Sequence, residues 1–194
     1  MNEFRTEASM TYVPMVHSIT NGETIMASAD IGAAPERIFR ALVTDEIEQW
    51  WGSSGTYRMI DWSADLRVGG RWTVVVRTAD GRSRPAGGEF LDIEAPRRIV
   101  QTRAYAWDHP TLGRRETKVA YLLEPIAIGT RITICHGGFA GLSEAAAEHA
   151  EGWARVLSWL QAYLDAGNRV AAWTRLFPSP PAGEGGSARQ RRDR

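Results

Sequence analysis

Two side chains that could hold a ligand lie four residues apart in the C-terminal third of the chain. His149 and Trp153 belong to the stretch HAEGWARVLSWLQAYL, whose apolar residues, Val156 and Leu160 among them, recur at helical spacing. Residues at this spacing share one face of a helix, so we expect all four to face the interior. His149 would offer one hydrogen bond to the polar end of a bound molecule, or it would be a core histidine bonded to a backbone carbonyl. Both interpretations stay open, and for Trp153 the pattern favours packing.

Strand-like segments supply further candidate wall residues. Trp72, Tyr121 and His136 each lie in a segment where apolar and polar residues alternate, as they do in a half-buried strand. The polar tips of Tyr121 and His136 would need hydrogen-bond partners if they were buried. Trp107 ends such a segment beside the loop DHPTLGRR, where it could guard an entrance. The sequence leaves undecided which face of each strand points inward, because a slip of one residue in register exchanges the two faces.

No group of residues indicates catalysis or metal binding. The four histidines lie far apart with no ligand spacing, and Cys135 is the one cysteine. Nothing places two carboxylates across a substrate, and no nucleophile with a base and an orienting group can be assembled. We therefore expect no catalytic residue, no metal and no cofactor. The carboxylates considered for acid–base chemistry are Asp61, Asp65, Glu89 and Asp92.

Composition and charge exclude several classes of partner. The 194 residues include 23 Lys plus Arg and 23 Asp plus Glu, so no global charge argues for nucleic acid or an anionic membrane surface. No apolar run approaches the roughly 20 residues that a membrane span needs. The polar start of the chain, MNEFRTEASM, lacks the apolar core of a signal peptide. We expect a cytoplasmic protein with no nucleic-acid and no membrane partner.

The elements that would position these residues can be followed along the chain. TIMASADI alternates like a strand, and the turn signal Asn21-Gly22 before it allows a hairpin. GAAPERIFRALVTD predicts a helix with Pro35 in its first turn, and EIEQWW predicts a second short helix that Gly52 ends. Between residues 57 and 136, six β-rich segments separated by turn signals predict an antiparallel meander.

A long helix follows the meander. We expect residues 1–19 to be a leader of uncertain order, 20–167 to form the domain, and 168–177 to extend its last helix. Residues 178–194 are rich in Pro, Gly and Arg, which predicts a disordered tail.

These elements predict an α+β fold. A curved antiparallel sheet of about seven strands needs a cover for its apolar face, and only the C-terminal helix is long enough to supply it. The two short helices after the first strand would close one end. Such a sheet curved around one helix should leave a cavity lined by apolar and aromatic groups.

The adjacent tryptophans of EQWWG belong to this closed end. Neighbours on a helix point about 100° apart, so the two cannot face the same way. We expect Trp50 to pack inward under the first helix and Trp51 to lie at the rim of the cavity, as a plug that shares in the ligand wall.

Several segments, in order and at similar spacing, resemble the SRPBCC (START-like) superfamily. They are ADIGAAPERIFRALVTDEIEQWWG, DLRVGGRW, GGEFLDIEAPRRIV, TKVAYLLEPIAIGTRITICHGGF and HAEGWARVLSWLQAYL. Within the superfamily, which includes many bacterial single-domain members, they are similar to the branch named after the activator of the 90-kDa heat-shock protein ATPase. The resemblance implies the helix-grip fold of the birch-pollen allergen. The eukaryotic activator has a further N-terminal domain, and fewer than 25 residues precede the first strand here, so we do not expect a chaperone partner.

Our first functional hypothesis is non-catalytic binding of a small hydrophobic or aromatic molecule between the sheet and the long helix. The first alternative is a cyclase- or hydrolase-type enzyme with His149 or His136 as acid or base. The second is a chaperone cofactor or protein-interaction domain that uses an exposed Trp50-Trp51 patch. The sequence also leaves open a homodimer that forms through a sheet edge or through the N-terminal leader. The expected ligand-binding residues are Trp51, Trp72, Trp107, Tyr121, His136, His149, Trp153, Val156 and Leu160.

Overall fold

The computed structural model describes residues 16–176, with side chains as far as residue 167. Eight strands form one antiparallel sheet in the order β1-β2-β8-β7-β6-β5-β4-β3. Two short helices follow β2, and a long helix ends the described chain. The elements are β1 (His17–Thr20), β2 (Thr24–Ile31), α1 (Pro35–Val43), α2 (Ile47–Trp50), β3 (Tyr57–Ala64), β4 (Arg71–Thr78), β5 (Ser83–Glu94), β6 (Arg98–Tyr105), β7 (Thr117–Ile126), β8 (Gly129–Gly137) and α3 (Ser143–Leu176).

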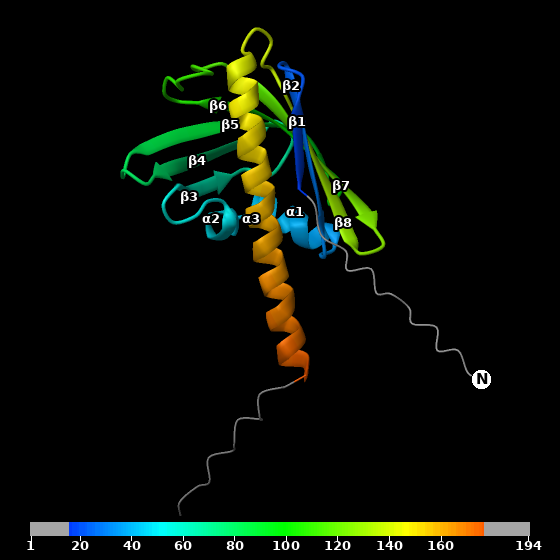
Figure 1. Cartoon of the computed structure of the whole chain (residues 1–194). Coiled ribbons are helices and arrows are strands. Elements are labelled where there is room, and N and C mark those ends of the chain that lie inside the picture. The colour runs from blue at the N-terminus through cyan, green and yellow to red at the C-terminus, as the bar shows by residue number, and fades with distance from the viewer. Residues whose placement is uncertain (1–15, 177–194) are drawn as a thin grey trace, which may run out of the picture.

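The sheet curves around α3, with β3 to β6 on one side of the helix and β1, β2, β7 and β8 on the other (Figure 1). The predicted α+β helix-grip fold is confirmed, with one strand more than the seven expected. The additional strand is β1, which pairs with β2 through the Asn21-Gly22 hairpin. The side-chain oxygen of Asn21 accepts hydrogen bonds from the backbone N–H groups of Glu23 and Thr24, which holds this turn.

The observed elements extend beyond both expected limits of the domain, residues 20 and 167. Strand β1 takes in residues 17–19 of the predicted leader, and the backbone of α3 stays helical to Leu176. Leader residues 1–15 and the predicted tail at 178–194 lie outside the described residues.

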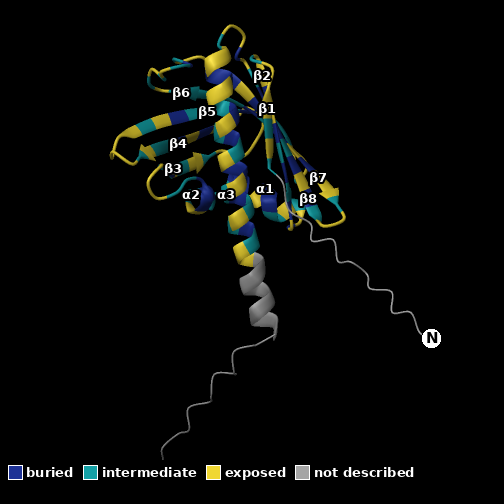
Figure 2. Cartoon of the chain, in the orientation of Figure 1, coloured by how far each residue is buried: buried dark blue, intermediate teal, exposed yellow. Residues whose placement is uncertain are grey.

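The hydrophobic core lies between the sheet and the inner face of α3, and buried residues recur along the described part of this helix (Figure 2). Leu157 and Leu160 have no exposed surface, and Leu164 is almost as deeply buried. Burying a side chain of this size contributes about 1.5–3 kcal/mol. On the sheet side, the inward-facing residues Ile132 and Ile134 of β8 are buried and complete this contact. The apolar stripe of α3 therefore fixes the helix over the sheet and sets the position of every cavity residue on it.

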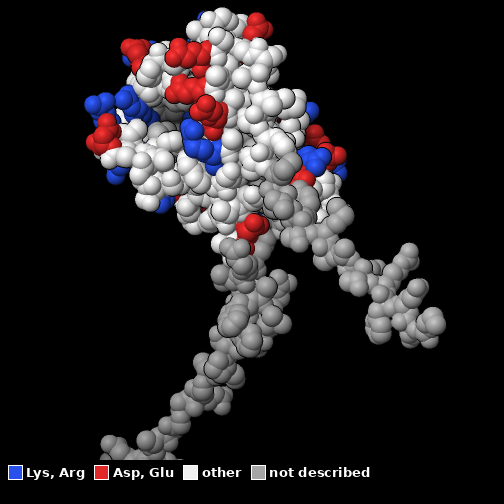
Figure 3. Space-filling model, viewed as in Figure 1, with Lys and Arg blue, Asp and Glu red and all other residues white. Residues whose placement is uncertain are grey.

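The opposite face of α3 carries charge. Figure 3 shows a row of acidic side chains along the upper part of the helix and a basic one below them. Glu144, Glu148 and Glu151 are exposed acidic residues of this part, and Arg155 follows one turn after Glu151. The helix is thus amphipathic, with its acidic face toward solvent.

The tryptophan pair lies at the closed end of the fold and is buried. Trp50 is 3% exposed and donates a hydrogen bond from Nε1 to the carbonyl of Ala41 in α1, at 3.0 Å. Trp51 is only 4% exposed, so its expected place at an open rim is wrong. Gly52 gives the reason. Its φ of +124° turns the chain back so sharply that a Cβ would lie 2.0 Å from the carbonyl oxygen of Tyr57, and β3 therefore starts against Trp51.

Because both tryptophans are buried, they form no exposed patch. A protein-interaction surface centred on Trp50-Trp51 is therefore ruled out, since such a surface must be accessible before the partner arrives.

Candidate functional site

A cavity of about 300 Å³ lies between the sheet and the first half of α3. This volume is at the lower end of the range for small-molecule sites. Strands β3 to β6 and β8 line it on one side, and α3 lines it on the other. The lining residues are Trp51, Tyr57, Val76, Thr78, Arg84, Arg103, Tyr105, Trp107, His109, His136, Glu148, His149, Gly152, Trp153, Arg155 and Val156.

Six of the nine predicted ligand-binding residues share this cavity. They come from four separate parts of the chain, which the fold brings together: Trp51, Trp107, His136, His149, Trp153 and Val156.

The structure places the other three outside the cavity. Trp72 is 1% exposed, donates from Nε1 to the carbonyl of Thr102 at 3.2 Å, and stacks on Trp62. Trp72 and Tyr121 border a second void of about 10 Å³, which is too small for an organic ligand. Leu160 has no exposed surface, because it lies one turn beyond Val156, where the sheet already closes on the helix.

His136 is the centre of a buried hydrogen-bond chain. The indole N–H of Trp153 donates to His136 Nδ1 at 2.9 Å, so Nδ1 carries the lone pair and Nε2 carries the proton. Nε2 then donates to the hydroxyl of Thr117 at 2.9 Å, and that hydroxyl donates to the carbonyl of Arg103 at 3.1 Å. Burial first, and then the charge of Arg103, keep the pKa of His136 well below its ordinary value. Both ring nitrogens are occupied, so His136 positions Trp153 and β6.

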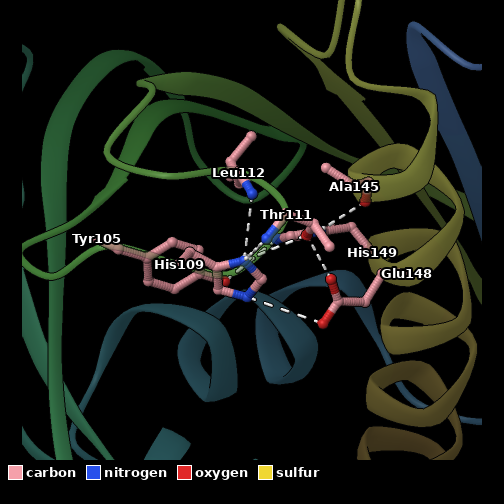
Figure 4. A network of polar contacts seen from close by, with 7 residues as sticks. All are labelled: Tyr105, His109, Thr111, Leu112, Ala145, Glu148 and His149. Atoms are coloured by element: carbon pink, nitrogen blue, oxygen red, sulfur yellow. Dashed lines mark hydrogen bonds and ion pairs between the residues drawn. The ribbon is translucent and has the colours of Figure 1, made fainter.

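His149 has an equally fixed tautomer. Its Nδ1 lies 2.8 Å from the carbonyl of Ala145, which can only accept, so Nδ1 carries the proton. The lone pair on Nε2 therefore accepts from the hydroxyl of Tyr105, at 3.2 Å. Figure 4 shows the two rings meeting between the end of β6 and α3. Burial lowers the pKa of His149 to about 4, so the ring is neutral at pH 7.

The loop after β6 is tied to α3 through His109 and Glu148 (Figure 4). The backbone N–H groups of Thr111 and Leu112 point to His109 Nδ1 at 3.4 Å, which leaves the proton on Nε2, 3.8 Å from Glu148. The hydroxyl of Thr111 donates to the same carboxylate at 2.5 Å. Burial lowers the pKa of His109, so this ring is mainly neutral as well. The ring of Tyr105 stacks on it at 4.7 Å. The loop and the helix thus close one side of the cavity together.

Arg103 and Tyr105 are cavity residues that the sequence did not single out. Alternation counted back from Trp107 would place both on the inner face of β6, but a charged residue in a strand is assumed to face water. Arg103 is half-buried, and its guanidinium lies 6.0 Å from the ring centroid of Trp51 and 5.5 Å from that of Tyr105. Both distances suit cation–π attraction. Burial lowers the pKa of Arg103, but neighbouring tyrosines outweigh this effect and raise it above its ordinary value.

Trp107 is held by a second arginine. The guanidinium of Arg84 lies 3.9 Å from the centroid of the Trp107 ring, while the indole N–H is buried without a hydrogen-bond partner among the described residues. Cation–π stacking therefore fixes the orientation of this ring.

The wall thus combines aromatic rings and neutral histidines with the side chains of three arginines and Glu148. Within the described part of the chain, no three His, Cys, Asp or Glu side chains gather in a way that could hold a metal ion. Nor does this part contain a helix long and apolar enough to cross a membrane. The arrangement suits non-covalent binding of a compact, unsaturated molecule.

Solved structures with the same fold come from several bacteria. A protein from Rhodobacter sphaeroides matches with a TM-score of 0.68 and 21% identity, over 78% of this chain and 99% of that one. A solution structure from Arthrobacter aurescens gives 0.66 and 22%, over 78% and 91%. The AHSA1-like protein from Aeromonas hydrophila gives 0.61 and 22%, over 75% and 94%. At these identities the likeness shows the fold alone. No curated protein matches the chain.

A family model matches at the level of sequence. The model of the activator of Hsp90 ATPase homolog 1-like protein covers residues 32–165, which is more than half of the chain and runs from the end of β2 into α3. This range includes every residue that lines the cavity. The chain therefore belongs to the activator of Hsp90 ATPase homolog 1-like (AHSA1-like) family of the SRPBCC superfamily.

Proposed function

We propose that this protein is a binding module that holds a small hydrophobic or aromatic molecule in the cavity between the sheet and α3. The observation that carries the proposal is the cavity of about 300 Å³, whose wall includes Trp51, Trp107 and Trp153. Desolvating an apolar molecule against such a wall is favourable, at roughly 25 cal/mol per Å² of apolar surface. The polar atoms of Trp153 and His136 are already hydrogen-bonded within the protein, Trp153 to His136 and His136 also to Thr117, which leaves their ring surfaces for the ligand.

Gly152 allows a direct test, because it lines the cavity from α3 and a Cβ at this position would meet no atom within 4 Å. Leucine at position 152 should extend into the cavity and reduce its volume. Replacing a helical glycine also improves helix propensity by up to about 1 kcal/mol. Gly167 provides a matched control, since it lies on the same helix, is exposed, and also meets no atom within 4 Å.

The experiment screens hydrophobic metabolites by thermal shift and native mass spectrometry on the wild type, Gly152→Leu and Gly167→Leu. We expect hits on the wild type and on Gly167→Leu, and a loss of at least tenfold in affinity on Gly152→Leu. The proposal fails if no compound binds the wild type, or if hits bind Gly152→Leu equally well.

One contact favours an enzyme as the second candidate. Tyr105 donates its hydroxyl proton to the neutral ring of His149, and both residues line the cavity. Such a pair could take a proton from a substrate through the tyrosine oxygen. If it does so in hydrolysis, turnover of p-nitrophenyl butyrate should be lost in His149→Gln and retained in Gly167→Leu. Equal rates in both variants would reject this candidate.

A further inference from the structure

Arg103 places a positive charge among the aromatic residues of the cavity wall. Its guanidinium is held by the ring faces of Trp51 and Tyr105, at 6.0 and 5.5 Å. None of the ion pairs in the described part of the chain includes this arginine. Charged side chains that lie this deep are normally paired, because removing an ion from water is unfavourable. Arg103 is thus a cation without a carboxylate partner in the described part of the chain, with the rings of Trp51 and Tyr105 beside it and a hydrogen bond to the Tyr105 side chain.

The other charged groups of the cavity wall are also mainly positive. Three guanidinium groups line it, from Arg84, Arg103 and Arg155, against the single carboxylate of Glu148. That carboxylate already accepts a hydrogen bond from Thr111 and lies beside the ring of His109. The cavity wall therefore carries a net positive charge, and its one negative group is occupied at the loop.

The histidines add no further charge. Burial lowers the pKa of His109, His136 and His149, and the charge of Arg103 acts in the same direction on all three. Arg103 is thus close enough to influence every histidine of the cavity. At neutral pH the positive charge of the inner wall is therefore that of the arginines.

We propose that the ligand is an organic acid, a molecule with an aromatic or aliphatic body and one carboxylate, and that Arg103 is the group that binds the carboxylate. This inference rests on the proposed binding function and narrows it to one chemical class. The body fills the space against Trp51, Trp107 and Trp153, and the carboxylate oxygens accept hydrogen bonds from the planar fork of the guanidinium. The hydrogen-bond chain from Trp153 through His136 and Thr117 ends on the backbone carbonyl of Arg103, so it holds β6 where this pairing needs it.

Matched probes of equal shape test the charge preference. Calorimetry compares 2-naphthoate with 2-naphthamide, and 4-phenylbutanoate with 4-phenylbutanamide, on the wild type. We expect at least one acid to bind tenfold or more tightly than its amide. Equal binding of acids and amides would overturn the acid inference and leave the binding function standing. Failure of all four compounds to bind would overturn both.

Variants of Arg103 then test the residue assignment. Arg103→Gln should lose the preference for the acid and keep its affinity for the amide, whereas Arg103→Lys should retain part of the preference, because it keeps the charge. Arg71→Gln, at an exposed position of β4 outside the cavity, serves as the control and should keep the full preference. The assignment is wrong if Arg103→Gln discriminates as the wild type does. Circular dichroism checks that each variant is folded. If Arg103→Gln does not fold, Arg103→Lys decides the assignment, and an acid preference as strong as that of the wild type would contradict it.

Discussion

The hydrogen bond between Trp153 and His136 is a buried contact whose loss can be predicted in size. Trp153 is 4% exposed and His136 is 1% exposed, and the bond between Nε1 and Nδ1 is 2.9 Å long. In Trp153→Phe the donor is lost and Nδ1 stays buried without a partner, which costs about 1–3 kcal/mol. The smaller ring adds a packing loss of about 1 kcal/mol, a fraction of the 3–5 kcal/mol typical of complete truncation to alanine. We therefore expect the free energy of unfolding to fall by about 2–4 kcal/mol.

Urea unfolding followed by circular dichroism measures this change. With a denaturant slope of about 2 kcal/mol/M, in the middle of the usual range, the midpoint should drop by about 1–2 M. Trp159→Phe is the matched control, because Trp159 lies on the same helix, is half-buried and packs edge-on against Tyr57 at 5.6 Å. This control should lose less than about 1 kcal/mol.

A double-mutant cycle isolates the bond itself. In a His136→Leu background no buried acceptor remains, so Trp153→Phe should cost about 1–2 kcal/mol less than it does in the wild type. Additive losses, or a loss in Trp153→Phe no larger than in Trp159→Phe, would refute the assignment of His136 as a structural acceptor.

Two further predictions concern pH and the turn at Gly52. The pKa of His149 is lowered to about 4 in the folded protein from 6.5 in the unfolded chain, so the unfolded state binds more protons between these values. The contribution of His149 to stability is therefore full above pH 6.5 and falls by about 3 kcal/mol as the pH drops to 4. Urea unfolding should show that the stability of His149→Gln depends less on pH than that of the wild type. Parallel curves for the two proteins would contradict the burial of a neutral ring. Gly52→Ala should destabilise by more than about 2 kcal/mol, because the added Cβ would overlap the carbonyl of Tyr57 at 2.0 Å. An unchanged thermal midpoint would show that the turn is built differently.

The architecture could be predicted because packing and periodicity determine it. Apolar residues at helical spacing identified α3, and alternation with turn signals identified seven of the eight strands. Strand β1 was harder to detect, since its four residues are mostly exposed and carry little pattern. The pair of His149 and Trp153 could be placed on one face for the same reason, and both line the cavity.

The details of the site depend on features that one sequence does not show. A helical stripe gives the inner face but not the length over which the cavity extends, so Val156 and Leu160 were indistinguishable although only Val156 lines it. Trp51 is buried because the backbone at Gly52 folds β3 against it, which depends on three-dimensional geometry. The inward position of Arg103 could not be predicted, because a cation on a strand is expected to face solvent. The aromatic rings around its guanidinium are what make the position inside the cavity favourable.

The most direct test of the central claim is a crystal structure of the protein with 2-naphthoate. The ligand density should lie in the cavity between β6 and α3, in contact with Trp51 and Trp153, with the carboxylate within hydrogen-bond distance of Arg103. Gly152→Leu crystals soaked in the same way should show no such density. Ligand density found only on the outer surface, or a wild-type cavity closed by its own side chains, would contradict the claim that this protein binds small molecules between its sheet and its long helix.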